Sequence, residues 1–421
     1  MRPRRVAYVS HSSLLGGERV LLRLLCALDR ARTEPLAVLP GPGPLGDALA
    51  REGVPVRETP LAWWIPATHW NEREFLAQLE GLPERAEALE RLLRAEGVEL
   101  VHSNVVVTLE GALAAARMGL PHVWHSRGLF DHRFPPPWSR DDDFLFGVLD
   151  RLSDAVVCVS EAVRRQTAPR VPHARVEVVY DGFDAEAFRR LPVTPDAEFR
   201  ARHDIAPGAR VAVSIGGIQR RKGLLDLVEA AALARRSDIV FLLAGAESEP
   251  EFAATLKERI GARRLADRFR FLGFQENVRD VLAHADVLVH PSLSEGFGFT
   301  VIEAMAAGRP VVATRCGGPE EIVREGVTGR LVAPGDPPAL AAAIDRVLED
   351  PGRAAAMGEA GRRDVERFTL EATARRTQDL DDAIAAGQEA PQTASRRAAA
   401  GPIADEVLRR GRAAARAGRS D

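Results

Sequence analysis

Short apolar runs alternate with segments of helical periodicity along most of the chain. Strands that are apolar at nearly every position are typical of a parallel sheet whose two faces are covered by helices. In the first half the expected strands are 5–10, 36–39, 99–102, 122–125 and 155–159. The expected helices between them are 18–28, 45–52, 109–118 and 144–152.

The same alternation starts again after the segment Arg190–Pro195, whose two prolines favour a linker. The expected strands of this second series are 210–215, 240–244, 270–272, 287–290, 311–314 and 330–332. The expected helices are 223–234, 251–261, 278–283, 300–307 and 319–324, followed by 340–348 and 359–384. Two series of similar size predict an α/β protein with two doubly wound, Rossmann-like domains facing across a cleft, with ligands at the carboxyl ends of the strands.

The expected domains are an N-terminal one over 1–189 and a C-terminal one over 196–365. From residue 385 to 421 the chain is rich in alanine and arginine, which favours a disordered tail. A weak electrostatic tether to an anionic surface is the alternative for this segment.

Length and composition agree with two globular domains. The chain has 421 residues, 46% of them hydrophobic and 28% charged, and this balance is typical of folded proteins. The net charge of −3 gives no indication of nucleic-acid binding. No apolar run spans a membrane, the start has no signal-peptide core, and the three scattered cysteines fit a reducing compartment. We expect a cytoplasmic protein, with peripheral association at the inner face of the membrane as an open possibility.

The segment from Ser292 to Gly308 carries the strongest chemical signal. Glu295 and Glu303 are separated by a Gly-Phe-Gly turn and the start of an alanine-rich helix. A helix that begins behind glycines presents free N–H groups and a partial positive charge to a phosphate. Glu303 is placed to accept from a ribose diol, and Glu295 from hydroxyls at the other end of the same ligand. A ligand that has an anionic group between two diol groups fits the structure of a nucleotide-sugar.

Lysine is almost absent from this arginine-rich chain, which has only Lys222 and Lys257. A compact ammonium and a planar guanidinium are not interchangeable at a tight phosphate site, so a retained lysine is informative. Lys222 lies in a loop after a strand and is followed by Gly223, whereas Lys257 lies in the middle of a polar helix. We therefore expect Lys222 to be the functional one.

These motifs resemble the retaining glycosyltransferases of family 4, which have the two-domain GT-B fold. The resemblance extends from about Arg5 to Leu380, and the block Ser-Glu-Gly-Phe-Gly…Glu-Ala-Met-Ala-Ala-Gly is its most specific part. It implies that the C-terminal domain binds the donor nucleotide-sugar and the N-terminal domain the acceptor. It also implies that a C-terminal helix, 366–384, crosses back to the N-terminal domain.

The resemblance also implies roles for individual residues. The implied catalytic residues are Lys222, Glu295, His125 and Arg221. The implied donor-binding residues are Gly16, Gly17, Gly216, Arg220, Phe274, Gly296, Phe297, Gly298, Phe299, Thr300 and Glu303. Lys222 would neutralise the departing phosphate, because a fixed cation beside a helix dipole stabilises the charge that develops there.

The chain departs from the family at one position. Members often carry an arginine directly after the glycine that ends the strand before the lysine loop, and here that position is Gly217. Arg220 or Arg221 are the two candidates to replace it. The family also has a histidine near the donor sugar, which matches His125, whereas we expect His102 to be structural.

Several further features have competing explanations. Gly317 and Gly318 match a family loop or form a plain turn. Asp141 to Asp143 include an Asp-x-Asp of the kind that binds a metal in another glycosyltransferase fold, but acids at a helix N-terminus explain them. The remaining aromatic candidates, which would grip an acceptor or a lipid surface or else anchor loops, are Trp63, Trp64, Phe134 and Trp138.

The sequence thus favours a metal-independent retaining glycosyltransferase that moves a hexose from a UDP- or GDP-sugar to an acceptor hydroxyl, without a cofactor. The acceptor is a sugar, a lipid-linked molecule or another small molecule. Two alternatives stay open. A nucleotide-sugar 2-epimerase on the same fold would need acid and base groups that no residue supplies clearly. A non-catalytic binding or scaffold subunit is suggested by Gly217.

Overall fold

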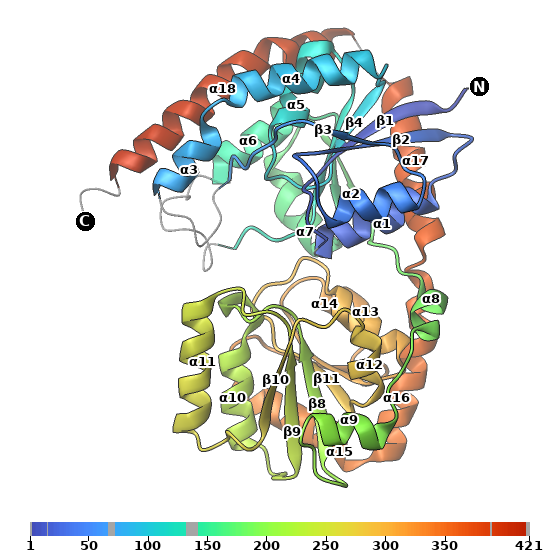
Figure 1. Ribbon diagram of the computed structural model, residues 1–421, viewed down its shortest axis with the longest axis vertical. Coiled ribbons are helices and arrows are strands. Elements are labelled where there is room, and N and C mark those ends of the chain that lie inside the picture. The colour runs from blue at the N-terminus through green and yellow to red at the C-terminus, as the bar shows by residue number, and fades with distance from the viewer. Residues whose placement is uncertain (1, 15, 66–71, 132–141, 388–389, 418–421) are drawn as a thin grey trace. The chain divides into compact units, whose positions relative to one another are not determined.

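The computed structural model describes residues 2–14, 16–65, 72–131, 142–387 and 390–417. The chain forms two compact units, and each is built around its own parallel sheet (Figure 1). The N-terminal unit consists of Met1–Gly182 and Leu370–Asp421, and the C-terminal unit of Phe183–Thr369. The fold class expected from the hydrophobic pattern is confirmed for each unit.

The N-terminal unit has a seven-stranded parallel sheet in the order β3-β2-β1-β4-β5-β6-β7. Its strands are β1 Arg4–Val9, β2 Thr33–Leu39, β3 Val56–Glu58, β4 Leu100–Ser103, β5 His122–Ser126, β6 Ala155–Cys158 and β7 Arg175–Val178. Its helices are α1 Gly16–Ala27, α2 Pro44–Arg51, α3 Glu72–Leu79, α4 Leu82–Ala95, α5 Glu110–Met118, α6 Asp142–Leu152, α7 Glu161–Thr167, η1 Ala168–Arg170, α17 Leu370–Ala386 and α18 Ala390–Ala417.

Strand β1 shows why apolar runs without alternation mark this fold. Val6 and Tyr8 point into a core that also contains residues of α1 and α17, whereas Ala7 and Val9 point into a second core on the other face. All four side chains are buried. Because helices cover both faces, neither set of alternate positions is polar.

The C-terminal unit has a six-stranded parallel sheet in the order β10-β9-β8-β11-β12-β13. Its strands are β8 Arg210–Ile215, β9 Ile239–Ala244, β10 Phe269–Gly273, β11 Val287–His290, β12 Val311–Thr314 and β13 Gly329–Val332. Its helices are α8 Ala185–Arg190, α9 Asp196–Arg202, η2 Arg220–Lys222, α10 Leu224–Leu233, α11 Pro250–Ala262, α12 Val278–Ala283, α13 Phe299–Ala306, α14 Pro319–Ile322, α15 Pro337–Glu349, α16 Pro351–Asp364 and η3 Val365–Arg367.

The expected strands all form, but the hydrophobic pattern missed two edge strands. β3 and β7 lie at the two ends of the N-terminal sheet and are partly exposed, so their sequences are too polar to stand out. Several amphipathic helices contain no continuous apolar run and were not predicted either. These are α3, α4, α7, α8 and α9.

The expectation of a disordered tail over 385–421 is wrong for most of that segment. Helix α18 packs against α3, α5 and α6 of the N-terminal unit (Figure 1). The side chains of Ala400, Ile403, Ala404 and Val407 are buried, and their spacing makes one apolar face. Arg396 forms a buried ion pair with Asp154. The composition did not indicate this apolar face, because its residues are mostly small and lie among many arginines.

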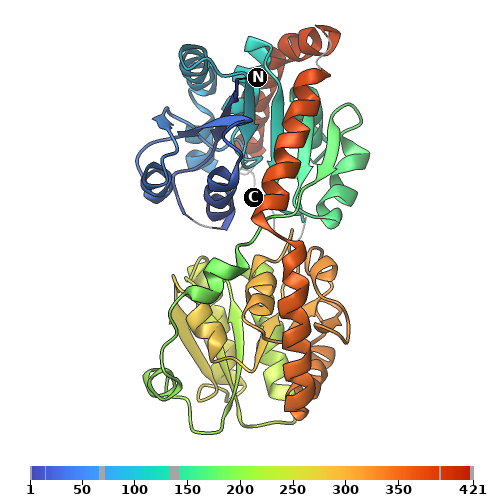
Figure 2. The ribbon, with the colours of Figure 1, turned by 90° about the vertical axis from the view of Figure 1, so that its right-hand side faces the viewer.

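The chain passes between the two units twice, at Gly182–Phe183 and at Thr369–Leu370. Phe183 forms an isolated parallel bridge with Thr369, and its N–H donates to the carbonyl oxygen of Phe368 at 2.8 Å. The single helix expected over 359–384 is interrupted at this pairing. Its residues are divided between α16 and α17. Helix α17 then runs along the N-terminal unit and packs against α1 (Figure 2). No helix in the described residues is long and apolar enough to cross a bilayer.

Candidate functional site

Three loops of the C-terminal unit meet at the carboxyl edge of its sheet, after β8, β11 and β12. Glycine makes their close approach possible. A Cβ at Gly223 would lie 2.0 Å from the carbonyl oxygen of Pro291, and one at Gly318 would lie 2.2 Å from that of Phe297. Glu295 bridges the second and third loops, since its N–H donates to Cys316 and its carbonyl accepts from Gly318. These loops are therefore held by backbone contacts.

Lys222 and Glu295 are brought together by this arrangement. The Lys222 Nζ lies 2.5 Å from Oε2 of Glu295, and both side chains are largely buried. Arg221 approaches the same oxygen with its Nη1 at 3.3 Å and donates to the carbonyl oxygen of Ser294 at 2.7 Å. Two cations therefore share one carboxylate, and the cluster carries a net positive charge.

The cations determine the ionisation of Glu295. Burial alone would raise the pKa of this carboxyl group, but Lys222 and Arg221 hold the pKa well below its usual value. The carboxylate is thus charged at neutral pH. A charged pair taken out of water is costly unless further charge or hydrogen bonds satisfy it. An anionic ligand beside the two cations would supply that charge.

His290 is a site residue that the sequence reasoning missed. It ends β11 and is buried, with Nε2 3.6 Å from Oε2 of Glu295 and Nδ1 3.3 Å from the hydroxyl oxygen of Thr300. Burial lowers the pKa of His290, against the opposing effect of Glu295. The histidine thus links the carboxylate to the first turn of α13. Its position two residues before the Ser-x-Ser-Glu block could have suggested it.

Helix α13 begins as the glycine turn predicts. Gly298 has φ +105°, in the left-handed region that favours glycine, and the helix runs from Phe299. Glu303 lies one turn into the helix and is 8% exposed, among neighbours that are entirely buried. Phe297 is buried against Phe368, and Gly296 precedes it in the turn. The first turn of α13 therefore opens beside the Lys222–Glu295 pair.

The two candidates for the missing family arginine lie differently. Arg220 is mostly exposed and faces Glu249, at 3.9 Å, whereas Arg221 faces Glu295. A Cβ at Gly217 would lie 2.4 Å from the hydroxyl of Ser248, so that exposed serine side chain would have to rotate to admit one. Gly216, with φ +143°, lets the Lys222 side chain pass at 3.1 Å from the place of a Cβ. The geometry favours Arg221 as the replacement.

The loop after β10 carries Phe274, which is 58% exposed. Gln275 donates to the carbonyl oxygen of Leu272 at 2.7 Å, and Asn277 to that of Pro192 at 2.8 Å. Both amide side chains thus hold the loop itself. An exposed aromatic ring on a fixed loop can stack on a planar ligand.

In the N-terminal unit the carboxyl edge is organised by Arg127, which the sequence analysis did not single out. Arg127 follows β5 and pairs with Asp181 at 2.6 Å. It also donates to Oδ1 of Asn104 at 2.7 Å and approaches Nδ1 of His125 at 3.2 Å. Burial raises the pKa of Asp181 in spite of this arginine. The signal in the sequence was an arginine directly after a strand that ends in histidine and serine.

His125 and His102 are both buried near this arginine. His102 bonds through Nε2 to Oδ1 of Asp381 on α17, at 2.6 Å, and stacks on Tyr8, so its contacts are structural as expected. Burial lowers the pKa of His125 well below its usual value, with Arg127 adding to the effect. The Nε2 of His125 is buried and has no hydrogen-bond partner in the described residues. That nitrogen is thus an unsatisfied polar atom beside Arg127.

The glycine loop of the N-terminal unit begins α1. A Cβ at Gly17 would lie 3.2 Å from Cδ of Arg127, whereas nothing lies within 4 Å of one at Gly16. Gly17 therefore allows the helix start to approach the arginine, and Gly16 faces open space. Leu15 lies outside the described residues.

The remaining candidates lie away from these clusters or outside the described residues. Asp142 and Asp143 occupy the first turn of α6, and Trp64 is buried, donating to the carbonyl oxygen of Val106 at 2.7 Å. Trp63 donates to Nδ1 of His11 at 3.1 Å. The described residues contain no group of three or more acidic, histidine or cysteine side chains placed to hold a metal ion. The candidates outside the described residues are Phe134, Trp138 and Asp141.

Two families of known sequences match the two halves of the chain. Residues 15–187 match "Glycosyltransferase Family 4", and residues 195–364 match "Glycosyl transferases group 1". The chain is also 31% identical over 313 residues to alpha-maltose-1-phosphate synthase of Mycobacterium tuberculosis, covering 68% of this chain and 79% of that protein. The chain belongs to the family 4 glycosyltransferases.

Further relatives place this glycosyltransferase in the same group. The D-inositol 3-phosphate glycosyltransferase of Streptomyces avermitilis is 34% identical over 307 residues, which are 67% of this chain and 64% of the relative. Among solved structures, Anabaena HepE in complex with UDP superimposes with a TM-score of 0.73 at 21% identity, covering 90% of this chain and 100% of that one. Sucrose-phosphate synthase from Thermosynechococcus elongatus gives 0.70 at 24% identity, covering 91% and 100%. These likenesses establish the GT-B fold of the glycosyltransferase.

Proposed function

We propose that this glycosyltransferase transfers a hexosyl group from a nucleoside-diphosphate sugar to an acceptor hydroxyl, with retention of configuration and without a metal ion. The observation that carries the proposal is the cluster of Lys222, Arg221 and Glu295 beside the first turn of α13. Its excess positive charge and the partial positive charge at the N-terminus of the helix suit a diphosphate.

The comparisons support the donor class. HepE was solved with UDP and with UDP-glucose, and two relatives of this chain are named as enzymes that form or transfer glycosyl groups. Phe274 is exposed on the loop where the family recognises the base, and Glu303 is one helical turn from the proposed diphosphate site. A UDP- or GDP-sugar therefore fits the surroundings of this cluster.

Leaving-group stabilisation is the main catalytic effect in this proposal. As the bond between the sugar and the phosphate stretches, negative charge grows on the diphosphate. Lys222 lies on a loop fixed by Gly223 and Leu293, so its ammonium needs little rearrangement to meet that charge. Pre-oriented charges of this kind supply several kcal/mol, on the order of 3 kcal/mol for one donor.

Glu295 is proposed to change its partner, from Lys222 in the free protein to the donor when the donor binds. In the structure its carboxylate accepts from the lysine; with a diphosphate bound, the ammonium turns to the phosphate and the carboxylate to the sugar hydroxyls. Acceptor attack on the same face of an oxocarbenium-like sugar, with the leaving phosphate taking the proton, retains the configuration. His125 of the N-terminal unit remains a candidate for contact with the donor sugar on the basis of the family resemblance.

A panel of UDP- and GDP-sugars tests the proposal. We expect one donor to protect the protein against thermal unfolding and to be hydrolysed slowly to the free nucleotide. Product analysis by NMR with an acceptor should show the donor's anomeric configuration. A donor converted without acceptor into a 2-epimer would instead make the protein an epimerase. Donor binding without any turnover, in the presence of varied acceptors, would make it a binding subunit.

A further inference from the structure

The C-terminal helix α18 lies beyond residue 364, where the second of the two family matches ends, so the family resemblance gives it no role. Near its start, Arg396 forms the buried ion pair with Asp154, directly before β6. The carboxylate of Asp154 also accepts from the N–H of His122, the first residue of β5, at 2.8 Å. The first part of α18 is therefore tied to the N-terminal sheet.

The other end of α18 contacts α6 and α3. Arg410 places its guanidinium group over the ring of Phe144 in the first turn of α6, 4.3 Å from the ring centroid. Gly411 is buried, and a Cβ there would lie 2.2 Å from Cδ1 of Leu79 on α3. Nothing lies within 4 Å of a Cβ at Gly401 on the same helix. The close approach of α18 to α3 therefore depends on the glycine at position 411.

Phe144 extends this contact to the loop after β3. Its ring meets the ring of Trp64 edge-on, with the two centroids 6.4 Å apart. Trp64 donates through Nε1 to the carbonyl oxygen of Val106 at 2.7 Å, and through its backbone N–H to that of Val107 at 2.9 Å. The loop is thus held between α6 and the segment after β4, at the carboxyl edge of the sheet.

Trp63, the neighbour of Trp64, faces the end of β1. Its indole N–H donates to Nδ1 of His11 at 3.1 Å. Because Nδ1 accepts, the neutral ring of His11 carries its proton on Nε2. That Nε2 is buried and has no hydrogen-bond partner in the described residues, whereas the indole of Trp63 is only half-buried. An aromatic surface beside an unsatisfied neutral donor suits a sugar, which offers apolar C–H faces and hydroxyl oxygens.

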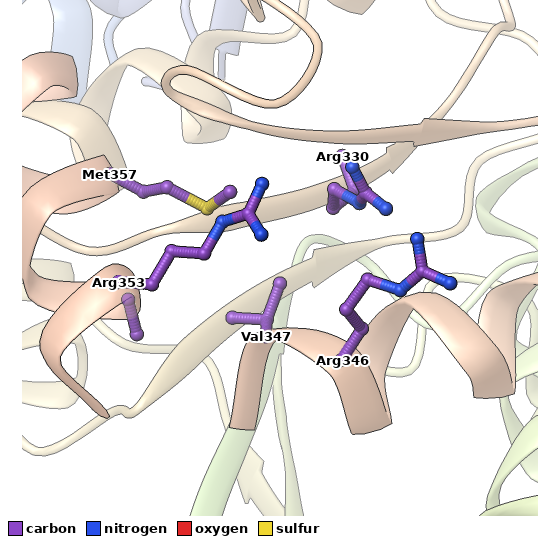
Figure 3. A pocket seen from close by; sticks show the side chains of 6 residues that line it. Arg330, Arg346, Val347, Arg353 and Met357 are labelled. Carbon is purple, nitrogen blue, oxygen red and sulfur yellow. The ribbon is translucent and has the colours of Figure 1, made fainter. Parts of the chain in front are cut away.

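Exposed arginine by itself does not mark a site in this protein. Figure 3 shows Arg330, Arg346 and Arg353 around a hollow between β13, α15 and α16. The hollow has a volume of about 10 Å³, which is room for about one water molecule. The arginines of α18 differ, since Arg396 is buried in an ion pair and Arg410 covers an aromatic ring. Helix α18 therefore acts through its packing contacts.

We propose that α18 positions the loop of Trp63 and Trp64 as a wall of the acceptor site, and that the acceptor presents a sugar ring to this wall. The proposal rests on the proposed transfer reaction, which needs a second ligand site besides the donor cluster. Ligands of parallel α/β sheets bind at the carboxyl ends of the strands, where this loop lies. The contacts from Arg410 through Phe144 hold Trp64, and Trp63 then has a fixed place beside His11.

Hydrogen–deuterium exchange of the full-length protein tests the positioning without any substrate. Gly411→Leu inserts a side chain against Leu79 and should move α18 away from α3. Gly401→Leu is the matched control, because it places the same side chain in open space on the same helix. We expect the peptide that contains the N–H of Trp64 to exchange about fivefold faster in Gly411→Leu and at the parent rate in the control.

A second pair of variants uses the ring contact. Arg410→Ala removes the guanidinium group from Phe144, and Arg409→Ala removes an equal charge that pairs with Glu406 on the outer side of the helix. The exchange at Trp64 should increase about twofold in Arg410→Ala and stay unchanged in Arg409→Ala. Arg410→Lys should restore the parent rate, since an ammonium group also binds an aromatic face.

Steady-state kinetics, with the donor that the panel of UDP- and GDP-sugars identifies, tests the role in acceptor binding. The probe acceptors are the methyl glycosides of glucose, galactose and mannose, and glycerol is the comparison without a sugar ring. In Gly411→Leu the KM for the glycoside should rise about tenfold, whereas the affinity for UDP and the rate of donor hydrolysis should stay those of the parent. Trp63→Ala should have the same effect, and Trp63→Phe, which keeps an aromatic ring, a smaller one.

The two measurements fail in different ways. Equal exchange at Trp64 in Gly411→Leu and Gly401→Leu would overturn the positioning by α18. An unchanged KM in Gly411→Leu, or transfer to none of the three glycosides by a protein that hydrolyses the donor, would overturn the acceptor wall. A protein that neither binds nor hydrolyses any donor would contradict the proposed function itself, and the acceptor wall with it.

Discussion

The carboxyl edges of the two units use arginine and carboxylate in opposite ways. In the C-terminal unit Lys222 and Arg221 share Glu295, so positive charge is in excess. In the N-terminal unit Arg127 is matched by Asp181 and is further satisfied by the side chain of Asn104. The first cluster has capacity for another anion. In the second cluster the charges are balanced without a ligand.

The difference indicates that the first cluster serves to bind a ligand, whereas the second serves to support the surrounding loops. A cluster with surplus charge has a cost in the free protein that a ligand can relieve, whereas a balanced, hydrogen-bonded cluster mainly fixes the loops around it. Arg127 ties together the ends of β4, β5 and the segment before the first chain crossing, through Asn104 and Asp181. Substitutions in the two clusters should therefore affect different measurements.

The largest effect is expected from Lys222→Ala. Turnover should fall by about 10²–10³-fold, because the charge on the leaving phosphate grows toward the transition state. Donor affinity should change less. Steady-state kinetics, with the donor that the panel of UDP- and GDP-sugars identifies, measures both quantities. Lys222→Arg should rescue poorly, since a guanidinium cannot take the place of the ammonium. Normal turnover with only a raised donor KM would rule out the leaving-group role.

Arg127→Ala should destabilise the protein rather than act on turnover alone. It leaves the buried Asp181 without its ion-pair partner, a loss of about 3 kcal/mol in the free energy of unfolding. Urea unfolding followed by circular dichroism measures this value. The variant Arg127→Ala/Asp181→Asn removes both charges and should recover part of the loss. A fully stable Arg127→Ala protein would contradict the supporting role.

Acid should weaken the N-terminal unit. Burial lowers the pKa of His122 to about 3 and that of His11 to about 4, from an ordinary 6.5. Both are neutral in the folded unit and take up protons on unfolding, so their contribution is complete above pH 6.5 and is lost as the pH falls toward these values. At pH 5 each of these two histidines lowers the free energy of unfolding by about 2 kcal/mol.

Unfolding measured at pH 7 and pH 5 tests this dependence. His122→Gln should lose less stability between the two pH values than the parent protein. Glu295 acts in the same direction but at lower pH, because its pKa is depressed and the stability that its charge contributes is lost only below its ordinary pKa of 4.5. Equal losses in the parent and in His122→Gln would show that His122 is not a source of the acid sensitivity.

Glu303→Ala sharpens the assignment within the donor cluster. We expect a loss of donor affinity on the order of 2 kcal/mol, the range for a hydrogen bond to a charged group. Free nucleoside diphosphate should lose affinity to a comparable extent, because the proposed contact is to the ribose. Calorimetry with both ligands makes the comparison. If only the intact sugar donor bound more weakly, Glu303 and Glu295 would have to exchange roles.

The smallest effect is expected from chelation. The proposed reaction uses Lys222 and the start of α13 for the phosphate charge, so EDTA should leave the rate unchanged within error. Loss of activity with EDTA, followed by recovery with Mn²⁺ or Mg²⁺, would contradict this expectation. Asp141 and Asp143, the two acids of the Asp-x-Asp, would then be the first residues to substitute.

The sequence predicted the fold and the loops of the donor cluster because both depend on local patterns. Apolar runs mark the buried strands, and Gly298 before an alanine-rich helix marks the turn into α13. Contacts between distant segments were not predictable in this way. The pair of Arg127 and Asp181 joins residues 54 positions apart, and His290 becomes a site residue only when Glu295 folds back over β11.

The two chain crossings make the N-terminal unit discontinuous in sequence. Leu380 and Ile384 of α17 complete the same core as Val6 and Tyr8, yet they are synthesised after the whole C-terminal unit. On the ribosome, the first half of the chain must therefore wait for the last segment before its core can close, while the C-terminal unit is already contiguous. A fragment that ends at Gly182 would expose that core, so chaperone dependence during synthesis should concentrate on the earliest residues rather than the latest.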